Sequence, residues 1–152
     1  MQTAGITVPN PTSVYRPPER AYLMHYSWNI ARRNHDPSTV PAYNGVEICW
    51  VHRNDTGAVD RTASSNAAEN MVTAYGIVRQ PALTSRHTIR QAFDITLSWA
   101  GDIDIVDARG TTVTINTAPR NGLNAQLRAV GATYGVIAGP ADDPPHWSTD
   151  GR

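Results

Sequence analysis

Two short segments, far apart in the sequence, carry side chains that metal ions prefer, and the fold must bring them together. The first segment holds His87 and Asp94, and the second holds His146 with Asp143 three residues before it. Neutral imidazole and carboxylate are suitable ligands for zinc. Because neither segment supplies a full ligand set, tertiary structure has to assemble the site, and metal binding is then coupled to folding.

This ligand set predicts a catalytic metal site. His87, Asp94 and His146 would give three protein ligands, which leaves the fourth tetrahedral position of a zinc ion free for water. The metal lowers the pKa of that water to about 7, and a nearby carboxylate can accept its proton as it attacks a carbonyl. Asp143 is the candidate general base, and Asp142 is the alternative.

The first segment resembles a signature of the zinc D-alanyl-D-alanine carboxypeptidase family. That family also contains the D,D-dipeptidases of vancomycin resistance and the L-alanyl-D-glutamate endopeptidases of phages. Its signature reads roughly Ser-x-His-x-x-Gly-x-Ala-x-Asp, and Ser85, His87, Ala92 and Asp94 fall in register. Arg90 departs from the signature because it stands where glycine is usual. We expect Arg90 at the rim of the cleft, facing solvent or paired with an acid such as Asp142.

The second segment resembles the family's other signature, an acid three residues before a histidine that an aromatic residue follows. Asp143, His146 and Trp147 match it. The family usually has Glu as the acid, although some phage endopeptidases have Asp. The two segments belong to a region of resemblance that spans about residues 46–147.

The resemblance implies a zinc peptidase that hydrolyses a peptidoglycan stem-peptide bond, of the L-Ala-D-Glu or the D,D type, as a phage endolysin does. In this family an Arg at the end of an early strand binds the substrate carboxylate or the oxyanion, and Arg53 lies at the matching place without the usual Ser-Gly before it. Arg53 could equally be a solvated surface arginine. Ser85 is expected to orient the site or contact substrate, and Trp147 to form a wall of the cleft.

Plainer interpretations of the same residues stay open. His87 could be a loop histidine and Asp94 a polar residue at a strand end, while acids before Pro144-Pro145 suit an ordinary turn. Two other functions also remain: a delivered antibacterial effector with the same chemistry, and a non-enzymatic structural protein of a virion that keeps the zinc fold.

Composition limits the partners of the chain. Its 152 residues suit one domain, and 13 Lys+Arg against 13 Asp+Glu give no basic field for nucleic acid. The single Cys49 excludes a disulfide within the chain, and we expect it to be buried in the apolar run 46–51. We expect a monomer whose partners are stem peptides.

The N-terminus lacks the features of a signal peptide, and no apolar stretch is long enough to span a bilayer. We therefore expect synthesis in the host cytoplasm and action on the wall in the periplasm after export by another route. No stretch of the chain reads as a separate wall-binding domain.

Periodicity and turn residues predict an α+β fold, with a small, mostly antiparallel sheet flanked by helices and a zinc site in a cleft at the sheet. We expect a single catalytic domain over residues 1–152 that begins with an extended arm, 1–20. Helices are predicted over 21–33, from Thr62 or Ser64 to about 78, and over 122–134 after a cap at Asn121. Strands are predicted over 46–51, 93–99, 102–106, 111–115 and 135–139, with His146 in the loop that follows.

Overall fold

A computed structural model describes residues 5–7 and 9–152, which divide into two compact units. The helical unit is residues 17–84, and the sheet unit combines the described part of residues 1–16 with residues 85–152. Helices and antiparallel sheets give the α+β class that the sequence predicts. A single catalytic domain over residues 1–152 stays a prediction. Part of the predicted arm lies outside the described residues, and its last residues, 18–20, already belong to a helix.

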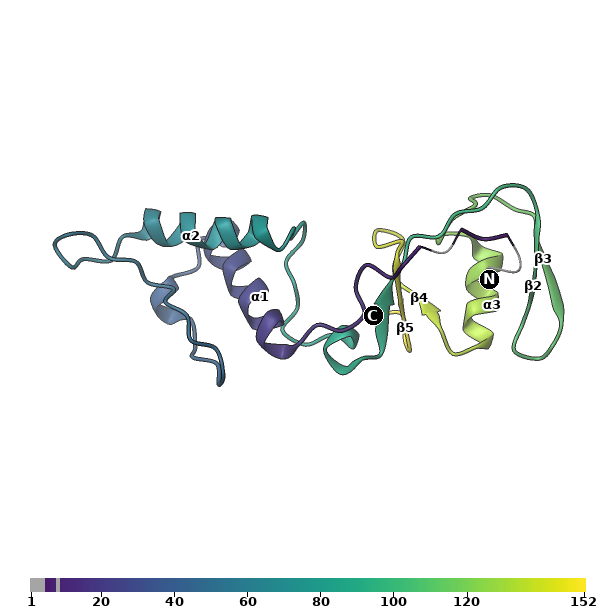
Figure 1. Cartoon of the computed structure of the whole chain (residues 1–152), viewed down its shortest axis with the longest axis horizontal. Helices are drawn as coiled ribbons and strands as arrows, with labels where there is room; N and C mark the ends of the chain where they lie inside the picture. The colour runs from purple at the N-terminus through teal and green to yellow at the C-terminus, as the bar shows by residue number, and fades with distance from the viewer. Residues whose placement is uncertain (1–4, 8) are drawn as a thin grey trace. The chain divides into compact units, whose positions relative to one another are not determined.

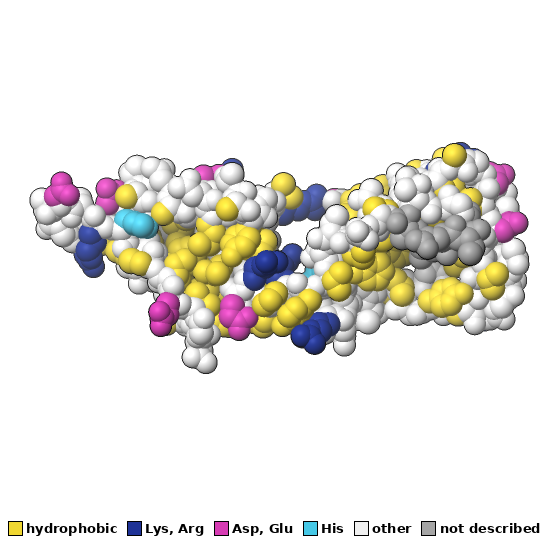
Figure 2. Space-filling model, in the orientation of Figure 1, with side chains coloured by type: hydrophobic (Ala, Val, Ile, Leu, Met, Phe, Trp, Pro, Cys, Tyr) yellow, Lys and Arg dark blue, Asp and Glu magenta, His cyan; other side chains and the backbone are white. Residues whose placement is uncertain are grey.

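Two α-helices and one 3-10 turn form the helical unit (Figure 1): α1 (Pro18–Arg33), η2 (Pro37–Thr39) and α2 (Arg61–Ala74). Both predicted helices are confirmed, with ends that differ by a few residues. Pro18 suits the first turn of α1, where a missing N–H costs nothing, and Arg32 and Arg33 lie near the negative end of the helix dipole. Figure 2 shows hydrophobic side chains gathered over α1 and α2 on the face in view.

The start of α2 is fixed by Asp60, whose side chain accepts a hydrogen bond of 2.8 Å from the main-chain N–H of Ala63. The predicted caps, Thr62 and Ser64, were therefore wrong. Ser64 is buried inside the first turn instead, and its hydroxyl donates to the Asp60 carbonyl at 2.8 Å. The negative charge of this carboxylate also interacts favourably with the positive end of the helix dipole.

The predicted strand over 46–51 was wrong, although its apolar pattern is real. Val46 and Ile48 are half-buried and Trp50 is buried, while Glu47 and Cys49 are exposed. The side chains therefore alternate as they would in a strand, but the segment pairs with no strand in the described part of the chain. The expectation that Cys49 is buried was wrong for the same reason, since one face of the segment is left to solvent.

Three short antiparallel strands form the main sheet of the sheet unit, in the order β1-β5-β4 (Figure 1). A separate hairpin pairs β2 with β3, which confirms the strands predicted over 102–106 and 111–115, and its turn contains Gly110, whose φ of +85° is easily adopted only by glycine. The bounds of these elements are η3 (Arg86–Ile89), β1 (Ala92–Asp94), β2 (Ile103–Val106), β3 (Thr112–Ile115), α3 (Ala125–Thr133), β4 (Ile137–Ala138) and β5 (His146–Ser148).

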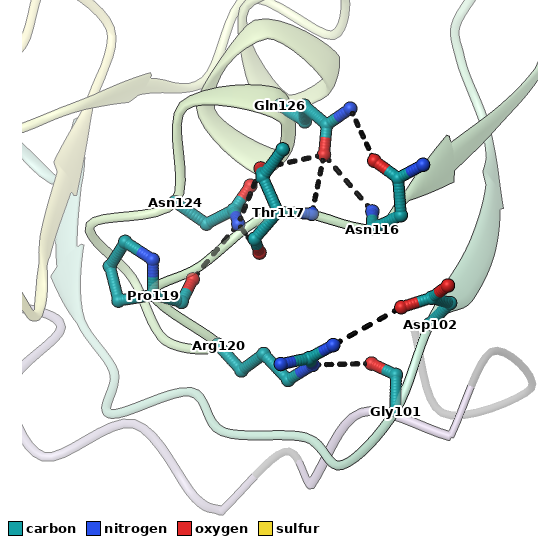
Figure 3. Close-up of polar contacts among 8 residues, drawn as sticks. All are labelled: Gly101, Asp102, Asn116, Thr117, Pro119, Arg120, Asn124 and Gln126. Atoms are coloured by element: carbon teal, nitrogen blue, oxygen red, sulfur yellow. Dashed lines mark hydrogen bonds and ion pairs between the residues drawn. The ribbon is translucent and has the colours of Figure 1, made fainter.

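The helix predicted over 122–134 is confirmed, but it starts later than predicted. Asn124 is the N-cap of α3 and accepts from the Leu127 N–H at 2.9 Å, so the predicted cap at Asn121 was wrong. The Asn124 amide also donates to the carbonyls of Thr117 at 2.7 Å and Pro119 at 2.9 Å (Figure 3). This fully buried side chain therefore ties the loop after β3 to the start of α3.

One hydrophobic core supports the sheet unit. It joins the inner faces of the two sheets to α3, and its buried members are Ile6, Ile95, Leu97, Trp99, Ile103, Ile105, Ile115, Leu127, Val130 and Trp147. Within the described residues, no helix has both the length and the apolar composition that a membrane span requires.

Candidate metal centre

Strand pairing brings the first two candidate ligands together. In the antiparallel register of β1 and β5, Asp94 lies directly opposite His146. Side chains of such cross-strand partners lie on the same face of the sheet. As a result, Oδ1 of Asp94 lies 3.1 Å from Nδ1 of His146. The prediction that His146 lies in a loop was wrong, because the residue begins β5.

The third candidate ligand comes from η3, which ends just before β1. Thr88 closes this short helix: its hydroxyl donates to the Ser85 carbonyl at 2.7 Å and accepts from the Ser85 N–H at 3.1 Å. His87 is thereby held with its Nε2 atom 3.2 Å from Oδ1 of Asp94 and 3.2 Å from Nδ1 of His146. Both imidazoles are buried, with His87 4% and His146 6% exposed.

The three ligand atoms form a nearly equilateral triangle that a metal ion could occupy. Two ligands of one tetrahedral zinc ion lie about 3.3 Å apart, given zinc–ligand bonds of about 2.0–2.1 Å. The edges of the triangle measure 3.1 to 3.2 Å, close to that separation. His87, Asp94 and His146 can therefore bind a metal ion without a large rearrangement.

The outer nitrogens of both imidazoles face main-chain oxygens. Nδ1 of His87 lies 3.4 Å from the Val14 carbonyl, and Nε2 of His146 lies 3.1 Å from the main-chain oxygen of Arg152. Both oxygens can only accept, so in the tautomer whose inner nitrogen is free to bind a metal, the outer nitrogen of each ring can donate its proton to one of them. In that tautomer the inner nitrogens present their lone pairs to a metal ion, whereas in the absence of metal the same nitrogens can donate hydrogen bonds to Asp94.

Residues 12–16 hold the backbone of two ligands in place. The main chain of Asp94 donates to the Ser13 carbonyl at 2.7 Å and accepts from the Thr12 N–H at 2.8 Å. The Arg16 N–H donates to the His87 carbonyl at 3.1 Å. This segment therefore fixes the relative position of η3 and β1 in addition to supplying the Val14 carbonyl.

The Asp94 carboxyl is kept in its ionised form. Burial acts to raise its pKa, but hydrogen bonds and charge attraction from His87 and His146 outweigh burial and hold the pKa below its ordinary value. An ionised carboxylate is the form that binds a metal ion.

Gly139 makes room for the His146 ring, a role that the sequence analysis missed. A Cβ atom at Gly139 would lie 2.8 Å from Cβ of His146 and 3.0 Å from its Cδ2 atom. The Gly139 N–H also donates to the His146 carbonyl at 2.7 Å. In sequence, a glycine before Pro140 indicates only a turn, and so gives no sign of this contact.

Asp143 lies on the turn that leads into β5. The His146 N–H donates to the Asp143 carbonyl at 3.2 Å, which closes the turn through Pro144-Pro145. The side chain of Asp143 is half-buried, whereas that of Asp142 is exposed. The role of either acid as general base stays a prediction.

Trp147 and Arg53, two of the predicted substrate contacts, have side-chain contacts with other parts of the chain than the three candidate ligands. Trp147 is 2% exposed and packs in the core, on the face of β5 away from His146, so its placement gives no support to a role in the cleft. Arg53 belongs to the helical unit, where its guanidinium donates to the Gly57 carbonyl at 2.8 Å. The substrate-binding role of Arg53 stays a prediction.

Ser85 and Arg90 lie at the two ends of η3. The Ser85 hydroxyl oxygen is buried and has no hydrogen-bond partner among the described residues, and its substrate-binding role stays a prediction. Arg90 is exposed, as predicted, and its guanidinium carbon lies 4.5 Å from the centroid of the Tyr15 ring. Its φ of +61° falls in the left-handed region that favours glycine. Arg90 does not belong to β1, which starts at Ala92.

Comparison of the chain with protein-family models, with curated proteins and with solved structures gave no match.

Proposed function

We propose that this protein is a zinc-dependent peptidase of the endolysin type that hydrolyses a peptidoglycan stem-peptide bond, of the L-Ala-D-Glu or the D,D class. The observation that carries the proposal is the convergence of Nε2 of His87, Oδ1 of Asp94 and Nδ1 of His146 within 3.2 Å of one another. Three such ligands suit a catalytic zinc site, because structural sites use four protein ligands.

The chemistry of the three residues fits zinc. Two imidazoles and one carboxylate are common zinc ligands, and the main-chain oxygens of Val14 and Arg152 can accept the outer-nitrogen protons of the ring tautomers that zinc needs. When bound, zinc would supply Lewis-acid chemistry: polarisation of a peptide carbonyl and activation of water. The chain's own contribution is to hold the three ligand atoms in a fixed triangle.

Asp143 is the residue we assign to proton transfer. It lies on the turn closed by the His146 N–H, so its main chain is tied to that of a metal ligand. In the proposed reaction its carboxylate accepts a proton from the attacking water and later donates it to the leaving amine. The family resemblance assigns Arg53 to the carboxylate of the stem peptide or to the oxyanion, and a planar guanidinium can make two parallel hydrogen bonds to a carboxylate.

The backbone of Arg90 supports the resemblance that underlies the substrate assignment. The zinc D-alanyl-D-alanine carboxypeptidase family usually has glycine at this place, and Arg90 adopts the left-handed conformation that glycine adopts without strain. The departure from the signature therefore changes the side chain but keeps the backbone conformation that a glycine would favour.

Digestion of purified peptidoglycan with the zinc-loaded protein, followed by mass spectrometry of the muropeptides, tests the proposal. We expect products cut at one stem-peptide bond, either L-Ala-D-Glu or a D,D bond, and no products from His87→Ala. His25→Ala is the matched control, since His25 lies on α1 and its Nδ1 pairs with the Pro81 carbonyl at 2.7 Å. Intact muropeptides from a protein that binds zinc would contradict the proposal and favour a structural role in a virion.

A further inference from the structure

A series of contacts leads from η3 to the outer nitrogen of His146. Arg86, next to the ligand His87, forms an ion pair with Asp150. Oδ1 of Asp150 accepts from the main-chain N–H of Arg152 at 3.2 Å. The main-chain oxygen of the same Arg152 lies 3.1 Å from Nε2 of His146.

The turn that carries the Arg152 oxygen is held at two further points. The hydroxyl of Ser148, on β5, accepts from the Arg152 N–H at 3.0 Å. Gly151 has a φ of +77°, and a Cβ atom there would lie 2.9 Å from the Ala138 carbonyl on β4. A side chain at residue 151 would therefore both strain the backbone and push the turn away from the sheet.

We propose that Arg86, Asp150 and Gly151 are positioning residues for the metal ligand His146. They hold the Arg152 oxygen as the acceptor for the Nε2 proton, so that the Nδ1 lone pair of the ring is available to a metal ion held together with Asp94 and His87. The inference rests on the proposed zinc site and extends it, because none of these three residues belongs to the ligand set. Hydrogen bonds to the outer nitrogen of a ligating histidine fix its tautomer and raise its basicity.

The exposure of the Arg86–Asp150 pair to solvent argues that its main role is to position the turn and not to stabilise the fold. Both side chains are about one-third exposed, at 35% and 33%, and ion pairs with this much solvent contact contribute little to folding. A second exposed pair in the sheet unit, Arg120 with Asp102 at 3.1 Å, also holds a loop, since Arg120 donates to the Gly101 carbonyl (Figure 3). That pair shows no contact with a metal ligand and so provides a matched control.

Zinc affinity, measured by competition with a chromophoric chelator, and the visible spectrum of the cobalt-substituted protein test the inference. We expect Asp150→Ala and Gly151→Ala each to weaken zinc binding about 10- to 100-fold and to change the cobalt spectrum. Asp150→Asn should recover part of the loss, because its amide oxygen can still accept from the Arg152 N–H. Asp102→Ala should bind zinc as the wild type does.

Two results would overturn the inference in distinguishable ways. If the wild type binds zinc and both Asp150→Ala and Gly151→Ala bind it equally tightly with unchanged cobalt spectra, the positioning role is wrong and the proposed function stands. If the wild type itself binds no zinc, the proposed function fails and the inference fails with it. The two variants disturb the turn by different means, so the test still gives an answer if one of them fails to fold.

Discussion

Oδ1 of Asp94 and Nδ1 of His146 lie 3.1 Å apart because the two residues face each other across the antiparallel strands β1 and β5. Pairing fixes the backbone of both residues, so that little side-chain freedom has to be lost when a metal binds. Only His87 reaches the site from outside the sheet, and residues 12–16 tie its helix to β1. The candidate metal centre is therefore largely preorganised by main-chain hydrogen bonds.

The two acids before β5 should differ in their effect on hydrolysis. We expect Asp143→Ala to keep zinc and to lose about 10²–10⁴-fold in turnover, the usual contribution of a general base. Asp142→Ala, at the exposed neighbouring residue, is the matched control and should stay near wild-type activity. Steady-state rates on muropeptides, with zinc content measured in parallel, check this. If Asp142→Ala is inactive while Asp143→Ala stays active, Asp142 and not Asp143 is the general base.

Gly139 should be required for tight metal binding. An alanine there places a Cβ atom 2.8 Å from Cβ of His146, which must shift the ligand. We expect Gly139→Ala to weaken zinc binding at least about tenfold.

Gly131→Ala gives the comparison for that variant. Its Cβ would lie 3.0 Å from the Trp147 ring, in the core on the other face of β5. Overpacking costs about 1–3 kcal/mol in unfolding free energy, so both variants should be destabilised while only Gly139→Ala loses metal affinity. Equal zinc affinity in the two would show that Gly139 has no special relation to His146.

The backbone at Arg90 should prefer glycine to alanine. Arg90→Gly removes the left-handed strain and loses the contact with Tyr15, whereas Arg90→Ala loses the contact and keeps the strain. We expect the glycine variant to exceed the alanine variant by about 1 kcal/mol in the free energy of unfolding. Zinc affinity should be unchanged in both. An Arg90→Gly protein that does not fold would make the arginine a structural residue.

The contribution of Asp150 to stability should disappear in acid. The hydrogen bond and charge of Arg86 lower the pKa of Asp150 to about 2 in the folded protein, from an ordinary value of 3.8. The folded state thus gains stability above the ordinary pKa and loses it as the pH falls from about 4 to about 2.

Urea unfolding of the metal-free protein at several pH values checks this expectation. The wild type should exceed Asp150→Ala by a small amount in unfolding free energy at pH 6, since the pair is partly exposed, and the difference should shrink towards pH 2. A difference that stays constant over this range would mean that the Arg86–Asp150 pair does not act through charge.

The ligand set could be predicted because it depends on the types of the residues and on their order in the sequence. The structure brings all three residues together. The hairpin and the three helices could be predicted from turn residues and periodicity. The strand of His146 could not, because β5 is only three residues long and follows Pro144-Pro145, which indicates a loop. The strand predicted over 46–51 was wrong because a short apolar run indicates that side chains are buried, and not whether a partner strand exists.

The main-chain contacts of the site had no signal in the sequence. The outer ring nitrogens face main-chain oxygens of Val14 and Arg152, and every residue has a main-chain oxygen, whatever its side chain. The close approach of Gly139 to His146 likewise depends on how β4 and β5 pair. Features of this kind follow from tertiary structure alone.

The most direct test of the zinc site is anomalous scattering at the zinc edge from crystals of the zinc-loaded protein. We expect one strong peak at about 2.0–2.2 Å from Nε2 of His87, Oδ1 of Asp94 and Nδ1 of His146. A peak at other residues, or no peak from a protein exposed to excess zinc, would contradict the assignment of these three residues as ligands.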